Sequence, residues 1–270
     1  MRSKKAFTLI ELLVVISIIA LLIGILLPAL GAARRTARQM QSNTQVRGIH
    51  QAMVMFSQSN REKFPGLDSR GSVIDDGAND QLIRGVQGLS GDAPEARFVI
   101  LLDGNYFTGE YCISPVETKT EWTSTDVDLT VDNYSYALLQ ITETDEDDKQ
   151  TGRFNEWKDT LNTEAIVISD RNTGDDADNE ISSIHTEQDG GDWRGSVGWN
   201  DNHVEFETTQ ILDTKYSNGA FNDSSQTNKE DNLFEPDDGV NVGIGGNPED
   251  NYNAYMTYEG RDDGGTNQDD

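Results

Sequence analysis

Residues 5–16 read KAFTLIELLVVI, and the interpretation of the N-terminal segment depends on this stretch. A basic stub, residues 1–5, opens the chain. The apolar run that begins at Ala6 reaches Ala33 with a single charge, Glu11. The part from Leu12 to Ala33 is uncharged, and a helix rising about 1.5 Å per residue over that length spans a bilayer core of about 30 Å. The sequence therefore predicts a membrane helix with one carboxylate near its start.

Three interpretations of this segment compete. They are a plain signal anchor, a cleaved secretory signal with its small-residue site at residues 31–33, and a helix whose carboxylate has a partner. The length of the apolar run and the arginines after it argue against the secretory signal. A carboxylate in hydrocarbon is costly and indicates a function. Cleavage before Phe7 would create a free α-amine, with which Glu11 of a neighbouring copy could pair.

The stretch from Lys5 to Ile16 resembles the type III signal of type IV pilins and type II secretion pseudopilins. The resemblance implies that a prepilin peptidase cuts between Ala6 and Phe7 and that the new N-terminal Phe7 is methylated. The family usually has Gly where this chain has Ala6, which is also small. The resemblance further implies an assembly role for Glu11 and a helix-breaking role for Pro28.

Pro28 removes one backbone hydrogen bond from the predicted helix. We therefore expect a kink or a melted turn there, with the end of the membrane helix as the alternative. Apolar residues recur at helical spacing beyond it, which predicts an amphipathic helix to about Asn60, ended by Phe64-Pro65-Gly66. These apolar residues are Ala32, Ala33, Ala37, Met40, Val46, Ile49, Met53 and Phe56.

The predicted fold class is α+β, with a long N-terminal hydrophobic helix packed on a small antiparallel sheet and with long acidic loops. The expected segments are a leader (1–6), a transmembrane and assembly helix (7–33), its amphipathic continuation (34–63), a globular head (64–216) and an acidic, loop-rich C-terminal segment (217–270).

Several elements of the head can be placed from the sequence. A helix is expected from Ala93 to Leu102, with a strand as the alternative, and strands are expected at Tyr134–Ile141 and Ala165–Ser169. A hairpin follows, with strands at 196–199 and 203–207. Its turn resembles a late hairpin turn of larger pilin-like proteins, with Asn202 where they have Gly. In its second strand the apolar Val204 and Phe206 alternate with Glu205 and Glu207, which predicts a sheet with one wet face.

Charge is unevenly placed along the chain, whose formal net charge is −27. Residues 1–63 hold nine Lys/Arg and two acids, which leaves twelve bases and 46 acids in residues 64–270. So acidic a part would repel phosphate, which argues against nucleic acid as its partner, and none is expected. A solvated surface is the plain interpretation, and calcium is the best ligand hypothesis. Its weak candidates are Asp175, Asp176, Asp178 and Glu180, and no other cofactor is expected.

The sequence contains no nucleophile elbow, no HExxH helix and no glycine-rich phosphate loop, so we expect no enzyme. His203 is expected to be a hydrogen-bonded structural residue of the hairpin turn. His185 is expected to be solvent-exposed, with a contact to Asp170 as the alternative. Cys112, the single cysteine, is expected to be a small, partly buried residue.

Together these features favour a structural subunit, stored in the inner membrane as a single-pass protein and polymerised into a type IV pilus-like or type II secretion pseudopilus filament. The basic stub favours a cytoplasmic N-terminus and a periplasmic or extracellular head, although arginines on the far side oppose it. Expected partners are prepilin peptidase, copies of itself, other pilins or pseudopilins, an inner-membrane assembly platform and the membrane. The alternative is a membrane-anchored extracellular binding protein, adhesin or enzyme with a helical tether, which would need neither Glu11 nor a small residue at the cut site.

Overall fold

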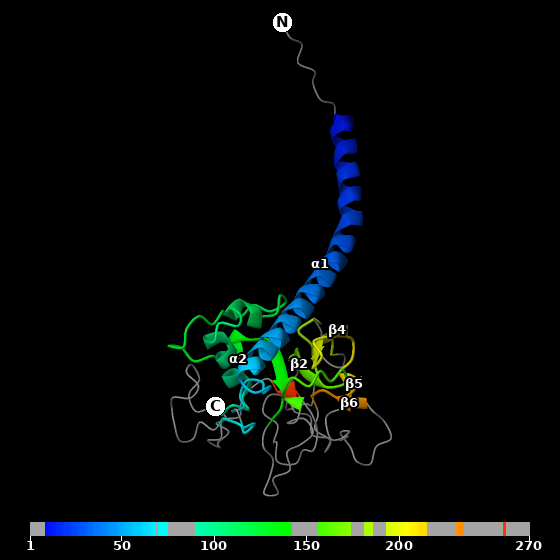
Figure 1. The fold of residues 1–270 in the computed structure, drawn as a ribbon. Coiled ribbons are helices and arrows are strands. Elements are labelled where there is room, and N and C mark those ends of the chain that lie inside the picture. Colours follow the sequence, from blue (N-terminus) through cyan, green and yellow to red (C-terminus); the bar gives the residue numbers. More distant parts are fainter. Residues whose placement is uncertain are drawn as a thin grey trace, which may run out of the picture. The chain divides into compact units, whose positions relative to one another are not determined.

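The computed structural model describes residues 9–68, 70–74, 90–141, 156–173, 181–185, 193–214, 230–234 and 256–257. The chain divides into two compact units, Met1–Met40 and Gln41–Asp270. Throughout its described residues the first unit is helical, and the second is an α+β head (Figure 1).

Helix α1 spans Leu9–Ser59, and its residues up to Met40 belong to the first unit. Glu11 lies in the first turn, where a carboxylate interacts favourably with the partial positive charge of the helix N-terminus. Residues 9–30 are exposed on every side of the helix, so its apolar surface is not covered within the single chain. The predicted long hydrophobic helix is confirmed.

The part of α1 in the second unit, from Gln41 to Ser59, buries one stripe of side chains. The spacing of three and four residues between them places them on a single helical face. The helix ends at Ser59, and positive φ angles of 52° at Arg61 and 67° at Glu62 turn the chain away before Phe64. The predicted helix and its end are therefore confirmed, and so is its apolar face at Val46, Ile49 and Met53. The apolar face predicted before Gln41 is wrong for the single chain, because Ala32, Ala33, Ala37 and Met40 are exposed. The buried residues are Ser42, Gln45, Val46, Ile49, His50, Ala52, Met53 and Ser57.

Helix α2 spans Pro94–Asp103, which confirms the helix expected here and excludes the strand. Proline suits the first helical position because the N–H it lacks would have no partner inside the helix. At the other end the backbone N–H of Gly104 donates to the carbonyl of Ile100, and that of Asn105 donates to the carbonyl of Leu102. The helix is buried on most sides in the head.

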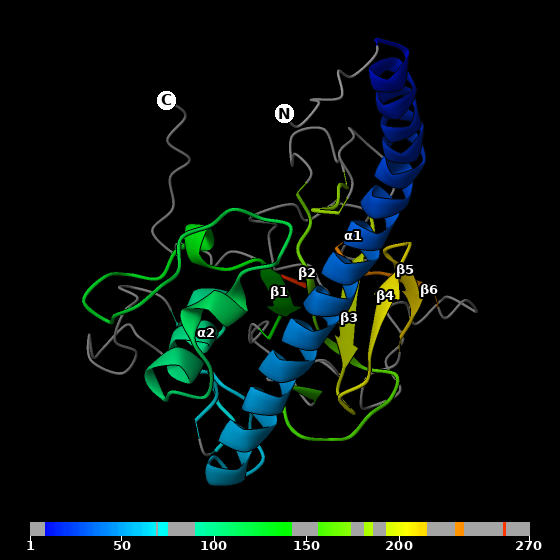
Figure 2. The same ribbon diagram turned by 90° about the horizontal axis from the view of Figure 1, so that it is seen from above.

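The main sheet is antiparallel throughout, with strand order β4-β3-β2-β1-β7, and α1 crosses over it in Figure 2. A second sheet pairs β5 with β6, and two short 3-10 helices lie between α2 and β1. The strands are β1 (Tyr136–Leu139), β2 (Ile166–Asp170), β3 (Gly195–Trp199), β4 (Val204–Glu207), β5 (Ile211–Asp213), β6 (Glu230–Asn232) and β7 (Met256–Thr257), and the short helices are η1 (Gly109–Cys112) and η2 (Val131–Asn133).

Burial in the sheet corrects one expectation. In strand β4, Val204 is buried and Glu205 is exposed, as the sequence indicates, whereas Phe206 and Glu207 are both partly buried. Every residue of β1, β2 and β3, however, is buried. The expected wet face is therefore wrong for the centre of the sheet. The core there also includes Trp193, whose ring lies 5.2 Å from that of Phe234.

The hairpin of β3 and β4 has the turn that its sequence predicts. Asn202 has a φ of 69°, a left-handed conformation that asparagine adopts more readily than most residues. The N–H of Trp199 donates to the carbonyl of His203 at 3.1 Å, and the two rings stack with centroids 4.2 Å apart. Asp201 accepts the backbone N–H of His203 at 3.0 Å and also contacts its ring. The structural role predicted for His203 is confirmed.

Helix α1 approaches β3 closely at Gly198. A Cβ atom there would lie 2.8 Å from Cγ2 of Ile168 and 2.9 Å from Cγ1 of Val46. Gly48, on α1 itself, leaves room for the ring of Tyr111, which a Cβ would approach to 2.5 Å. Small residues therefore set the spacing of α1 from its neighbours in the head.

Candidate assembly segment

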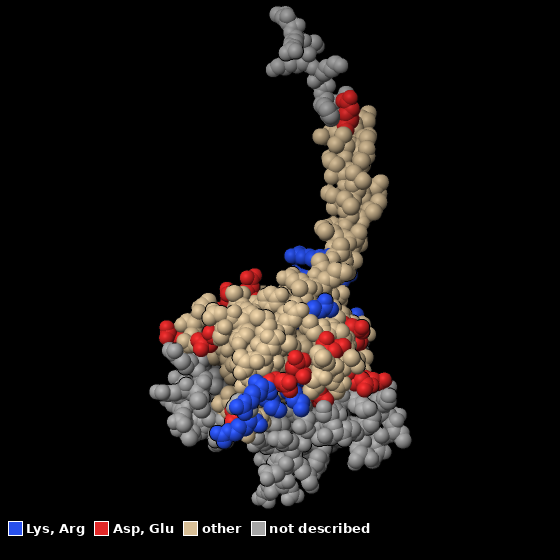
Figure 3. All heavy atoms as spheres, in the orientation of Figure 1, with Lys and Arg blue, Asp and Glu red and all other residues tan. Residues whose placement is uncertain are grey.

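The segment predicted to act in assembly is residues 7–33, with the predicted cleavage site at its start. Its cleavage residues, Ala6 and Phe7, lie outside the described residues. Glu11 lies in the first turn of α1. Apolar and small side chains follow it without another charge until Arg34, and Figure 3 shows this uniform surface below the single acidic group.

The large apolar side chains of this segment are strongly exposed. Leu9 is 79% exposed, and even Val15, the least exposed of them, is 45% exposed. Exposure of apolar surface on this scale in water is rare in soluble monomers and marks contact with a membrane or with protein. Within the described residues, α1 is the one helix that is long and apolar enough to cross a membrane.

Pro28 lies within α1, and the helix continues on both sides of it. Of the expected kink or melted turn, the melted turn is therefore not seen in the single chain, nor does the helix end here, and the kink stays a prediction. Because proline has no N–H, the carbonyl of Gly24 still lacks its α-helical donor. The helix consequently carries a weak point among residues 24–28.

A buried carboxylate links α1 to the sheet in the head. Asp170, fully buried at the end of β2, accepts hydrogen bonds from the hydroxyl of Ser42 at 3.2 Å and from the backbone N–H of Ser196 in β3 at 2.6 Å. Nε2 of His185 lies 3.0 Å from the same carboxylate. Three separate segments are thus joined at one side chain.

His185 corrects a second expectation, because its side chain is only 5% exposed rather than solvated. The alternative interpretation, a contact with Asp170, is confirmed. The ring also packs edge-on against Phe206 of β4, with centroids 4.9 Å apart. Ser42 and His185 both contact the carboxylate, which is the arrangement of a structural clamp rather than of an activated nucleophile.

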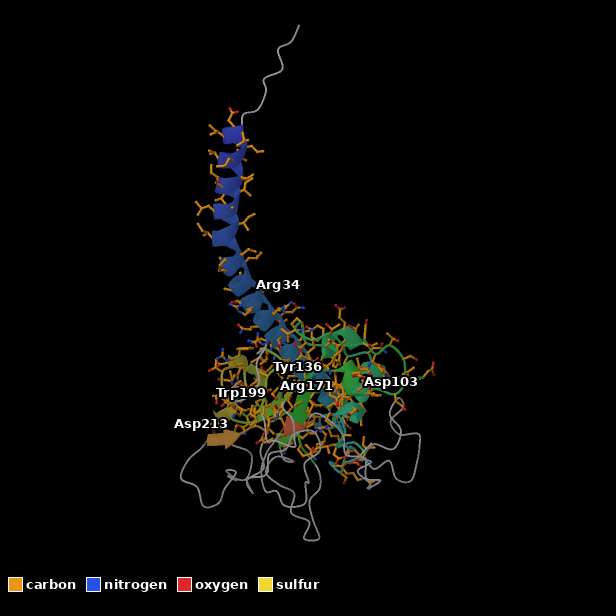
Figure 4. All side chains as sticks on the ribbon, turned by 180° about the vertical axis from the view of Figure 1, so that it is seen from behind. Arg34, Asp103, Tyr136, Arg171, Trp199 and Asp213 are labelled. Carbon is orange, nitrogen blue, oxygen red and sulfur yellow. The ribbon has the colours of Figure 1, made fainter. Side chains whose placement is uncertain are left out.

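Next to this clamp, Gln45 of α1 joins two further elements. It accepts a hydrogen bond from the hydroxyl of Tyr136 in β1 at 3.1 Å and donates to the carbonyl of Ile113 at 3.0 Å. Burial, together with the nearby Asp170, raises the pKa of Tyr136 well above its ordinary value. The tyrosine therefore remains a neutral donor. Figure 4 labels Tyr136 in the head.

On the same helix, His50 contacts the hairpin turn. Its Nδ1 lies 3.2 Å from Oδ1 of Asn202, and its ring packs edge-on against Phe64. Burial lowers the pKa of His50, so the imidazole is neutral near pH 7, although hydrogen bonding with Asn202 and Asn200 opposes this shift. His50 therefore connects α1 to the β3–β4 turn as a neutral, structural residue.

Arg97 of α2 is a fully buried cation. Its guanidinium donates to the carbonyl of Leu139 at 2.7 Å and to that of Asp92, and it lies 4.7 Å from the ring centroid of Trp157. Burial lowers its pKa to about 10, an effect that Asp92 and Glu95 partly oppose. The guanidinium is therefore charged at neutral pH and holds α2 against β1.

The remaining candidates carry no site chemistry within the described residues. Cys112 is fully buried, more so than expected, and burial raises its pKa. The calcium candidates Asp175, Asp176, Asp178 and Glu180 lie outside the described residues. Within the described part of the chain no group of three or more His, Cys, Asp or Glu side chains could hold a metal ion.

A long apolar N-terminal helix with an acid in its first turn and a small antiparallel sheet is an α+β, pilin-like arrangement. Residues 1–27 match the family model of the prokaryotic N-terminal methylation motif. This motif is the signal for prepilin-type cleavage in type IV pilins and pseudopilins. No curated protein and no solved structure matches the chain. Motif and helix together indicate a single-pass, membrane-anchored precursor of the pilin type.

Proposed function

We propose that this protein is a structural filament subunit. It is stored in the inner membrane with its N-terminus in the cytoplasm, is cut between Ala6 and Phe7 by prepilin peptidase, and is methylated on Phe7. It then polymerises into a type IV pilus-like or type II secretion pseudopilus filament. The observation that carries this proposal is the position of Glu11, inside the methylation motif, near the start of a helical segment (residues 9–30) that is otherwise uncharged and exposed throughout.

Glu11 acts through the amine that cleavage creates. After removal of the leader it is the fifth residue of the chain, one helical turn from the new N-terminus. A carboxylate entering an apolar bundle loses its hydration, a cost that pairing with the Phe7 amine of a neighbouring copy offsets. The pair forms at one axial offset between copies and therefore sets their register.

The exposed helix supplies the rest of the interface. Side chains that contact lipid in the stored subunit contact other copies of α1, or other pilins or pseudopilins, in the filament. The weak point at Pro28 lets the helix stretch locally when copies pack together. An inner-membrane assembly platform moves the subunit from one environment to the other, and the protein performs no catalysis.

The first test is the mass of the N-terminal peptide from protein isolated from its native cells. A chain that begins at Phe7, with a mass increase of one methyl group, is the expected result. An intact Met1 start would instead indicate a tethered binding protein, adhesin or enzyme. A start at Arg34 would indicate an ordinary secreted protein.

The second test separates storage from assembly. We expect Glu11→Ala to leave membrane insertion unchanged and to weaken incorporation into filaments about a hundredfold, because breaking a buried ion pair costs roughly 3 kcal/mol or more. The matched control is Glu62→Ala, which removes the same charge from an exposed position after α1. Normal filaments in the Glu11 variant, or equal losses in both, would refute the pairing.

A further inference from the structure

Between its first turn and its end, helix α1 carries charge of one sign only. The chain has 48 acids among its 270 residues, yet none lies between Glu11 and Glu62. The five charged side chains in that interval are all arginines, at positions 34, 35, 38, 47 and 61. Three of them follow the uncharged segment directly, with Arg34 as the first charge after Ala33.

The depth of these three arginines matches one layer of a membrane. If Leu12–Ala33 crosses the hydrocarbon, the four steps from Arg34 to Arg38 rise roughly 6 Å along the helix. The headgroup region on each side of a bilayer is roughly 5–7 Å thick. Arg34 and Arg35 are exposed and Arg38 is partly buried, and Figure 4 shows Arg34 on α1. Arg47, nine residues after Arg38, falls beyond that layer.

From this placement we propose that Arg34, Arg35 and Arg38 form a binding site for anionic phospholipid headgroups, at the membrane face where α1 leaves the hydrocarbon. A guanidinium binds phosphate oxygens through two parallel hydrogen bonds, and each basic residue near an anionic surface strengthens attachment about fivefold. The site rests on the membrane-stored subunit proposed above and adds a ligand to it.

Removal of the leader makes this site more important. The leader carries Arg2, Lys4 and Lys5, which flank the apolar segment on its other side. Once residues 1–6 are cut away, the arginines from 34 to 38 are the cationic side chains that still flank the membrane helix. Lipid is favoured over the acidic surface of a second copy, because the membrane fixes headgroups at this depth in every stored subunit.

The experiment uses the full chain in vesicles of phosphatidylcholine, with and without 30% phosphatidylglycerol. Insertion is measured first, as resistance to alkaline extraction from neutral vesicles. Lipid preference is then measured on protein released from the vesicles that contain phosphatidylglycerol. Native mass spectrometry identifies the lipids that this protein retains. The variant R34Q/R35Q is compared with R47Q/R61Q, which removes the same charge from exposed positions of the same chain. Glutamine has nearly the helix propensity of arginine.

We expect the unaltered chain to retain phosphatidylglycerol in preference to phosphatidylcholine. R34Q/R35Q should weaken that preference about tenfold or more, whereas R47Q/R61Q should keep it. No preference in the unaltered chain, or equal losses in both variants, would overturn the lipid site. A preference that persists in R34Q/R35Q while association between copies is lost would also overturn it and assign the arginines to a protein interface. Failure of the unaltered chain to insert would contradict membrane storage itself.

Discussion

The two parts of α1 share a helical backbone but differ in the burial of their side chains. From Leu9 to Leu30 every residue is exposed, whereas the part from Gln41 to Ser59 buries a stripe of eight residues. The first part has no polar face, and the second has polar residues opposite its buried stripe. Helical structure therefore says little about the role of a segment, whereas the distribution of its apolar side chains says where its partner lies. The second part finds its partner within the chain, and the first requires lipid or other copies.

Among the substitutions that test this comparison, Asp170→Ala is expected to change the free energy of unfolding most. This replacement leaves the hydroxyl of Ser42, the N–H of Ser196 and the ring of His185 without their shared acceptor. Each buried polar group left without its hydrogen-bond partner costs about 1–3 kcal/mol, so with three such groups we expect a loss of roughly 3–5 kcal/mol in the free energy of unfolding. All four tryptophans lie in the head, so denaturant unfolding followed by their fluorescence reports on it.

The matched control for Asp170 is Ser42→Ala, which removes a single donor and leaves the acceptor with two others. We expect it to cost about 1 kcal/mol. Equal losses in the two variants would show that the carboxylate is not the centre of the clamp.

A smaller effect is expected when the two parts of α1 are tested with the same substitution. Ile49 is fully buried in the head and Ile18 is 53% exposed. Ile49→Ala should destabilise the head by about 2–4 kcal/mol through lost burial and a cavity, and Ile18→Ala should change it by less than about 0.5 kcal/mol. The measurement is the same fluorescence-detected unfolding, in detergent. A substantial loss at Ile18 would contradict the independence of the two parts.

The smallest effect is a pH dependence at Cys112. Burial raises the pKa of this thiol above its unfolded value of about 8.5, so the unfolded chain loses the proton first as pH rises. The stability that Cys112 contributes is present below that value and declines above it, by about 1 kcal/mol between pH 8 and pH 9.5. The difference in unfolding free energy between the unaltered protein and Cys112→Ala, measured under reducing conditions, should shrink by that amount. A constant difference would show that the thiol is not buried in solution.

Much of the fold follows from local sequence. The helix ending at Ser59, helix α2 and the β3–β4 hairpin with Asn202 in its turn each depend on neighbours in the chain, and each could be predicted. Contacts between distant segments could not. Nothing near His185 in the sequence indicates that it lies against Asp170, and nothing around β1 to β3 shows that both faces of the sheet are covered. In the candidate site, Glu11 stands out because a lone charge in an apolar run is local information, and the roles of Ala6 and Phe7 stay predictions.

The way α1 is attached to the head bears on how the protein would carry load. Ser42, Gln45 and His50 contact β2, β1 and the β3–β4 turn in succession, and Val46 packs against β3 between them. In the filament proposed above, tension would pull each subunit along the axis of this helix. Contacts spaced along that axis are strained together rather than one after another, so the head resists detachment with the sum of its contacts and not with the weakest of them.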